Sequence, residues 1–155
     1  MALKEIINKD VSTVRSGANL NDVARLMYKN HTGAVIVINN KDKNKEKGKP
    51  IGVITDRDIA LEFGKSGKID PKKNVDQIMT TSPVTCNSDD GIYETIQKMR
   101  EHGVRRIPVV NKKEHLVGIV ASDDLINLLG NEIYDLSQII NYNSIRSSSK
   151  PRVTL

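Results

Sequence analysis

A threonine and an aspartate three residues apart, near the middle of the chain, are the best candidates for chemistry. In the segment from Gly52 to Asp58, the hydroxyl of Thr55 ends an apolar run and the carboxylate of Asp58 falls in the first turn of a predicted helix. An aspartate at such a junction can accept hydrogen bonds from both hydroxyls of a ribose, and a helix N-terminus favours a nearby phosphate. The same spacing also fits a capping box, which satisfies only the donors of the helix. The spacing alone leaves both interpretations open.

The junction occurs twice, because the chain contains an internal duplication. Residues 3–38 align with residues 75–110, and beyond a lysine-rich loop residues 52–59 align with residues 118–125. A duplication of this size indicates two related supersecondary units that bury their faces against each other. We therefore expect function where the two copies meet.

Each copy predicts the same order of elements. A helical stripe is formed by Leu20, Val23, Ala24 and Met27 in the first copy and by Ile92, Thr95, Ile96 and Met99 in the second. Two apolar strands follow, at 34–38 and 51–54 or at 106–110 and 116–120, with Pro108 expected at a strand start or an edge. Short helices at 56–63 and 122–129 would end at Gly64 and Gly130. The unit is β-α-β-β-α, twice, in the α/β (α+β) class.

These patterns divide the chain into a first unit at 3–63, a linker at 64–74 and a second unit at 75–129. A further helix is expected at 130–142, with Ile133, Leu136 and Ile140 on one face. Twelve residues are too few to hold a helix alone, so it must dock on its own module or on a partner subunit. The Ser-rich segment 143–155 is predicted to be a disordered tail.

The basic charge is confined to two segments. Of the formal charge of +5, residues 41–49 contribute +3 and residues 144–155 contribute +3, which leaves −1 for the rest. A solvated loop and a basic tail explain this distribution without a partner. The alternative is a nucleic-acid-binding protein that uses both segments, but an aromatic content of 3% offers few platforms for stacking bases.

The sequence predicts no enzyme, no catalytic cofactor and no metal site. His31, His102 and His115 show no metal-ligand spacing, and we find no nucleophile elbow or Walker loop. The single cysteine, Cys86, is expected to be a buried small hydrophobe. With no membrane segment and no secretory signal visible, we expect a cytoplasmic protein.

The motifs in both copies resemble the cystathionine-β-synthase (CBS) domain family. They are Gly-Val-Ile-Thr-Asp-Arg-Asp-Ile-Ala from Gly52, Gly-Val-Arg-Arg-Ile-Pro-Val-Val from Gly103, and Leu-Val-Gly-Ile-Val-Ala-Ser-Asp-Asp-Leu from Leu116. The resemblance implies two repeats packed sheet to sheet with pseudo-two-fold symmetry. Such a tandem pair, called a Bateman module, is a regulatory unit that binds adenosine-containing ligands (AMP, ADP, ATP or S-adenosylmethionine) in clefts between its domains.

The resemblance also implies site residues. Asp58 and Asp124 would be the ribose-binding carboxylates, with Thr55 as the accompanying hydroxyl in the first copy. In the second copy Ala121 stands at the hydroxyl position and Ser122 is displaced by one residue. The clefts would be composite, with Met79 and Val84 around the base whose ribose meets Asp58, and Ile7 and Ser12 around the one that meets Asp124.

Arg105 and Arg106 would meet phosphates at the mouth of a cleft, whereas the first copy has Gly33 and Ala34 at those positions. A solvated strand end is the alternative role of the arginines. The two clefts would therefore differ in affinity.

The resemblance further implies a homodimer and a responding effector protein. The helices after the junctions would form the dimer, which gives Ile59, Leu61, Leu125 and Leu128 either an interface role or a core role. An adaptor whose clefts have lost their ligands is a third possible function.

Overall fold

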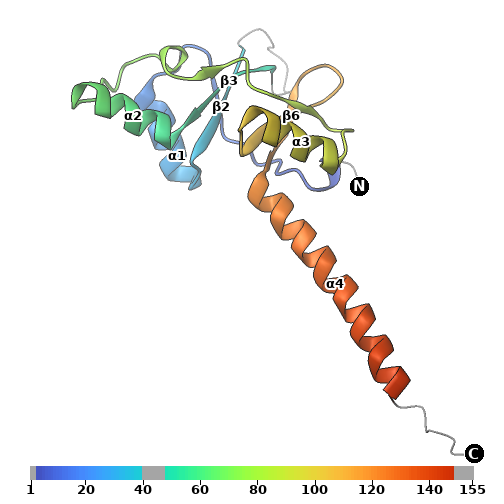
Figure 1. Cartoon of the computed structure of the whole chain (residues 1–155). Coiled ribbons are helices and arrows are strands. Elements are labelled where there is room, and N and C mark those ends of the chain that lie inside the picture. Colours follow the sequence, from blue (N-terminus) through green and yellow to red (C-terminus); the bar gives the residue numbers. More distant parts are fainter. Residues whose placement is uncertain (1–2, 40–47, 149–155) are drawn as a thin grey trace, which may run out of the picture. The chain divides into compact units, whose positions relative to one another are not determined.

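The structure is a computed structural model that describes the backbone of residues 3–39 and 48–148 and the side chains of these ranges up to residue 142. The chain divides into two compact units, Met1–Ala121 and Ser122–Leu155. The first unit contains both small β-sheets, and the second is built on one long helix (Figure 1). The lysine-rich residues 40–47 and the last seven residues, 149–155, lie outside the described residues.

The first sheet has the strand order β1-β2-β3-β4. Strand β1 (Thr13–Arg15) is parallel to β2 (Ala34–Ile38), which is antiparallel to β3 (Pro50–Thr55). Helices α1 (Leu20–Asn30) and α2 (Asp56–Ser66) pack next to each other, α1 against β2 and α2 against β3. This is the predicted β-α-β-β-α unit.

The second sheet repeats this arrangement in the order β5-β6-β7. Strand β5 (Cys86–Asn87) is parallel to β6 (Arg106–Val110), and β6 is antiparallel to β7 (Leu116–Ala121). Helix α3 (Ile92–His102) connects β5 to β6. A shift in strand register also occurs at the equivalent place in both sheets, between Val37 and Ile38 in one and between Val109 and Val110 in the other. The predicted α+β fold with two related halves is confirmed.

The two sheets pack face to face through a small apolar cluster. Ile36 of β2 is fully buried with Leu116 of β7, and Val53 of β3 and Ile119 of β7 pack around them. Apolar side chains that fill the space between two sheets are the usual reason why such layers associate. The copies therefore share one core.

The copies also exchange short segments across their edges. Strand β4 (Thr80–Thr81) comes from the start of the second copy and pairs antiparallel with β3, with Val53 opposite Thr80. At the equivalent place Asn8, from the start of the first copy, forms an isolated bridge with Ile119 of β7. Each sheet is thus completed by the other copy, as pseudo-two-fold symmetry requires.

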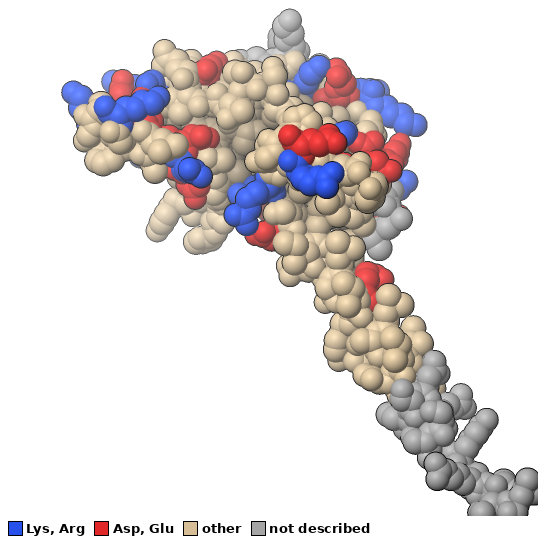
Figure 2. Space-filling view, viewed as in Figure 1, with Lys and Arg blue, Asp and Glu red and all other residues tan. Residues whose placement is uncertain are grey.

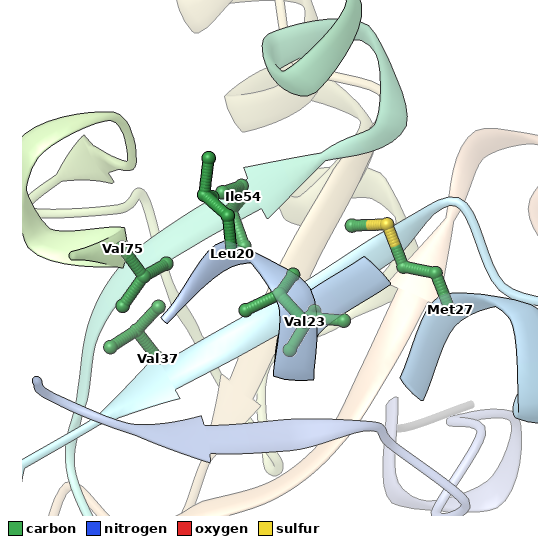
Figure 3. Packing of buried hydrophobic residues seen from close by; sticks show 7 residues of the cluster. Leu20, Val23, Met27, Val37, Ile54 and Val75 are labelled. Carbon is green, nitrogen blue, oxygen red and sulfur yellow. The ribbon is translucent and has the colours of Figure 1, made fainter. Parts of the chain in front are cut away.

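The exchanged segment also enters the hydrophobic core of the first copy. Val75, in the 3-10 helix η2 (Val75–Gln77), is fully buried among residues of α1, β2 and β3. Figure 3 shows the packed side chains Leu20, Val23, Met27, Val37, Ile54 and Val75. Burial of these apolar side chains is the main term that stabilises this half of the molecule. One residue of each predicted helical stripe, Ala24 in α1 and Ile96 in α3, is exposed rather than buried.

Two predicted helix ends are wrong. Helix α2 continues through Gly64 to Ser66, and Gly67, at φ 71°, provides the left-handed C-cap. Helix α4 (Ser122–Ser148) runs without a break through Gly130 and includes residues 143–148, which we expected to be disordered. A glycine can remain helical at a cost of about 1 kcal/mol relative to alanine, so its presence alone does not end a helix.

Pro108 lies inside a strand rather than at its start. It is the third residue of β6 and stands opposite Ile119 of β7, whereas β5 pairs only with Val109 and Val110. The β5 side of the strand is therefore unpaired at Pro108. A proline, which lacks a backbone N–H, is tolerated at such a local edge.

Candidate functional site

A cavity of about 460 Å³ lies between the two sequence copies, within the compact unit Met1–Ala121. Its walls come from β2, β3, β4, the segment after β4, the end of α3 and β6. The lining residues are Ala34, Val53, Thr55, Thr80, Ser82, Pro83, Val84, His102, Val104, Arg105, Arg106 and Pro108. A concave site of this size, largely apolar with a few polar groups, is typical of small-molecule binding.

The cavity is composite because of the exchanged segment. Thr55 ends β3 of the first copy, while Thr80, which pairs with Val53 of the same strand, belongs to the start of the second copy. The chain then continues through Ser82 and Val84 along the same wall. Val84 and Thr55 therefore line the same cavity, and Val84 comes from the second copy.

Thr55 and Asp58 hold each other in place at the start of α2. The Oδ2 atom of Asp58 accepts hydrogen bonds from the backbone N–H of Thr55 at 2.7 Å and from its hydroxyl at 2.9 Å. The Asp58 N–H donates to Thr55 Oγ1 at 3.2 Å. The capping box is therefore present.

Capping leaves part of the junction available to a ligand. Thr55 lines the cavity, whereas Asp58, which is half-buried and hydrogen-bonded to Thr55, is not among the lining residues. Among the described residues none donates a hydrogen bond to the second carboxylate oxygen of Asp58, Oδ1. The junction can thus cap its helix through Oδ2 and still accept a hydroxyl through Oδ1.

Three basic residues also line the cavity. Arg105 directly precedes β6 and Arg106 is its first residue; both are exposed. His102 ends α3 one turn earlier, and its Nδ1 donates to the backbone carbonyl of Lys98 at 3.0 Å, which leaves Nε2 as the ring nitrogen open to a ligand. Guanidinium groups in this position suit an anionic part of a ligand.

Met79 does not line the cavity. It packs against the core of the first copy, and its Sδ lies above Gly52 of β3. Sequence reasoning missed His102 and the polar residues Thr80 and Ser82. The signal for the last two was their place beside β3, which only the pairing of β4 reveals.

The second predicted site draws on both units. Ile7 packs over Gly118 of β7, and Ser12 accepts a hydrogen bond from the side chain of Asn30 at 2.8 Å. Ser122 begins α4, where its hydroxyl donates to Asp123 at 3.2 Å, and Asp124 is exposed in the first helical turn. A common site for these residues remains a prediction.

Burial explains the state of Cys86. Its side chain is 1% exposed in β5, as expected for a small core residue. Desolvation by this burial raises the pKa of the thiol above its ordinary value, which suppresses the reactive thiolate.

The described ranges contain neither a cluster of metal ligands nor a membrane-spanning helix. No group of histidine, cysteine, aspartate and glutamate side chains within them is placed to hold a metal ion. In the same part of the chain no helix has the length and apolar character needed to cross a membrane.

The fold and cavity define a tandem α+β protein with a ligand-sized site between its two copies. The family model of the CBS domain matches the chain twice, at residues 3–65 and 75–131, so the chain belongs to the CBS domain family. It is 34% identical over 132 residues to the CBS domain-containing protein YhcV of Bacillus subtilis, covering 84% of this chain and 88% of that protein.

Solved structures of similar proteins contain adenosine compounds. The CBS domain protein PAE2072 of Pyrobaculum aerophilum, complexed with AMP, matches with a TM-score of 0.71 and 25% identity, over 81% of this chain and 90% of that one. The CBS domain pair of protein MJ0100, in complex with 5′-methylthioadenosine and S-adenosyl-L-methionine, matches with a TM-score of 0.72 and 27% identity, over 85% and 98%. Some longer relatives carry enzyme names, and this chain covers only 23–24% of their length.

Proposed function

We propose that the chain is a regulatory module that binds an adenosine-containing ligand in the cavity between its two copies. The observation that carries the proposal is the composite cavity, whose lining combines Thr55 of the first copy with Arg105 and Arg106 of the second. The similar proteins PAE2072 and MJ0100, which hold adenosine compounds, support the same class of ligand.

In the proposed complex, each part of the ligand meets chemistry that suits it. Oδ1 of Asp58 accepts from the ribose while Oδ2 keeps the helix cap, so binding does not require the capping box to open. Apolar side chains such as Val53, Val84 and Val104 surround the base. The two arginines and His102 face the phosphate or other anionic group. We assign no catalytic step to these residues, and the regulatory role is proposed because the chain belongs to the CBS domain family.

Thermal unfolding with and without ligand tests the proposal. A ligand that binds only the folded state stabilises it by about 2.7 kcal/mol at one hundred times its Kd, or roughly 5–10 °C in Tm for a chain of this size. We expect at least one of AMP, ADP, ATP and S-adenosylmethionine to raise Tm in this way.

The variant Asp58→Ala identifies the site, and Asp22→Ala is its matched control. Asp22 is likewise an acidic residue in the first turn of a helix, α1, but the cap of that helix, Asn19, does not line the cavity, whereas Asp58 bonds to the cavity-lining Thr55. Each variant is compared with itself, with and without ligand, so that a lost cap does not mimic lost binding. We expect the ligand-induced shift to disappear in Asp58→Ala and to persist in Asp22→Ala. An equal shift in both variants would exclude the assigned ribose contact, and no shift with any of the four ligands would exclude the function.

A further inference from the structure

Helix α4 carries a regular apolar stripe that the proposed ligand site does not use. Its five members alternate at spacings of three and four residues, and they are Ile126, Leu129, Ile133, Leu136 and Ile140. This spacing is the a and d pattern of a coiled-coil heptad, with isoleucine at every a position and leucine at every d position.

The apolar side chains of the stripe are largely exposed to water, which is energetically unfavourable. The five side chains are 41–68% exposed, and Ile139 and Tyr134 nearby are 59% and 63% exposed. Between Ile126 and Ile140 the only charged residues are Glu132 and Asp135. Figure 2 accordingly shows much of the visible face of α4 as uncharged surface. A contiguous apolar surface of this kind marks an interaction site.

The continuity of α4 points in the same direction. The helix has 27 residues and keeps Gly130 in its interior, where glycine disfavours a helix. It has no pair of opposite charges one turn apart between Ile126 and Ile140. Helices with so little intrinsic support depend on packing of their apolar face. A partner for the stripe would supply that packing.

The pattern specifies the kind of partner. Among parallel coiled coils, isoleucine at a with leucine at d favours two strands, and in such a pair each side chain meets its own equivalent across the interface. The stripe is therefore complementary to itself. Two such stripes in contact would remove on the order of 1,000 Å² of surface from water, which reaches the lower range of specific interfaces. A second copy of this chain meets every one of these requirements.

We propose that α4 pairs in parallel and in register with α4 of a second copy of the chain, through the stripe from Ile126 to Ile140. This interface differs from the one implied by the family resemblance, which would use Ile59, Leu61, Leu125 and Leu128. It is also independent of the ligand site, because none of its residues lines the cavity.

Sedimentation velocity over a range of concentrations tests the pairing with the full chain. The test variant is Leu136→Glu in the stripe, and the matched control is Gln138→Glu, which adds the same charge at an exposed position outside it. We expect a dimer for the unaltered chain and the control, and a dimer Kd raised roughly tenfold or more in Leu136→Glu. Far-UV circular dichroism and the ligand-induced Tm shift check that both variants remain folded. A monomeric unaltered chain, or a dimer unaffected by Leu136→Glu, would overturn the proposal.

Disulfide trapping tests the direction of the helices. Ile126 and Ile140 are fourteen residues apart, or about 21 Å along a helix. In a parallel pair, Ile126→Cys chains cross-link to each other under diamide, and so do Ile140→Cys chains. An antiparallel pair would instead cross-link an Ile126→Cys chain to an Ile140→Cys chain. Preferential formation of that mixed product would refute the parallel register. Cys86 is buried, so it does not compete for the oxidant.

Discussion

The Sδ atom of Met79 lies above Gly52, in the space that a Cβ at position 52 would fill. The other copy repeats the relationship, because a Cβ at Gly118 would come within 2.9 Å of the Ile7 side chain and of the Asn8 backbone. Gly52 of β3 and Gly118 of β7 therefore each leave room for the segment that the other copy contributes. The requirement for glycine here is one of space and not of backbone conformation.

A side chain at position 52 is expected to push that segment away. Gly52→Val should destabilise the chain by about 1–3 kcal/mol, the usual cost of overpacking. Because β4 leads into Ser82 and Val84 of the cavity wall, ligand affinity should fall as well. Urea unfolding gives the first quantity and calorimetric titration with the ligand that raises Tm gives the second.

Gly64→Ala is the control for this substitution. Gly64 lies inside α2, and a Cβ added there would meet nothing within 4 Å, so alanine should stabilise the chain by about 0.4–1 kcal/mol. If Gly52→Val is as well tolerated as Gly64→Ala, the close packing of Met79 has no energetic importance.

The hydroxyl of Thr55 should stabilise the chain without ligand, because it caps α2. Thr55→Val removes the hydroxyl that accepts from the Asp58 N–H and should cost about 0.5–2 kcal/mol without ligand. Thr55→Ser keeps a hydroxyl and should lose much less. Unfolding by urea measures both variants, and equal losses would show that the hydroxyl does not cap α2 in solution.

The basic residues of the cavity predict a preference among adenosine ligands. Arg105, Arg106 and His102 line the cavity. The phosphorylated nucleotides should therefore bind more tightly than S-adenosylmethionine, whose sulfonium is positive. The double variant Arg105→Gln, Arg106→Gln should reduce this preference, and raised salt should weaken nucleotide binding in the unaltered chain. Competition calorimetry gives the ratio of affinities. A preference that survives in the double variant would remove the arginines from the site.

The order of elements could be predicted because it depends on local patterns. Apolar runs such as residues 34–38 are long enough to identify buried strands. Ser16 and Asn19 are both suitable residue types for the cap of α1, and Asn19 takes that position. Ser88 and Asp89 are good N-cap residue types just before α3, but Gly91 takes that position. Asn87 and Asp90 bond within the turn before it, so the polar side chains there serve the loop. Sequence spacing does not distinguish a polar side chain that caps a helix from one that bonds within the preceding turn.

The cavity could be predicted only in part because its walls are distant in sequence. Thr55, Val84, Arg105 and Arg106 were expected near a ligand, and all four line the cavity. Met79 was placed there as well, yet it fills the space over Gly52. Whether Met79 or its neighbour Thr80 faces the cavity depends on the pairing of β4 with β3. A shift of one residue in that pairing would reverse the sides, and no local pattern fixes it.

An ion pair between α2 and the linker should make stability depend on pH. Glu62 accepts hydrogen bonds from Lys73 and from Lys65, the latter at 3.1 Å, and its side chain is 12% exposed. The hydrogen bonds from Lys73 and then Lys65 lower the pKa of Glu62 below its ordinary value of 4.5. A carboxyl with a lowered pKa in the folded state stabilises that state above its unfolded pKa, and the contribution is lost as pH falls through the folded pKa.

The variant Glu62→Gln should therefore be less stable than the unaltered chain at neutral pH. The difference should shrink as pH falls from above 4.5 through the lowered pKa of the folded state, because both chains are then uncharged at position 62. Urea unfolding at a series of pH values measures it, with Glu94→Gln as an acid-to-amide control for a residue outside the ion pairs that join α2 to the linker. A difference that stays constant across this pH range would mean that Glu62 stabilises the fold by packing and not by its charge.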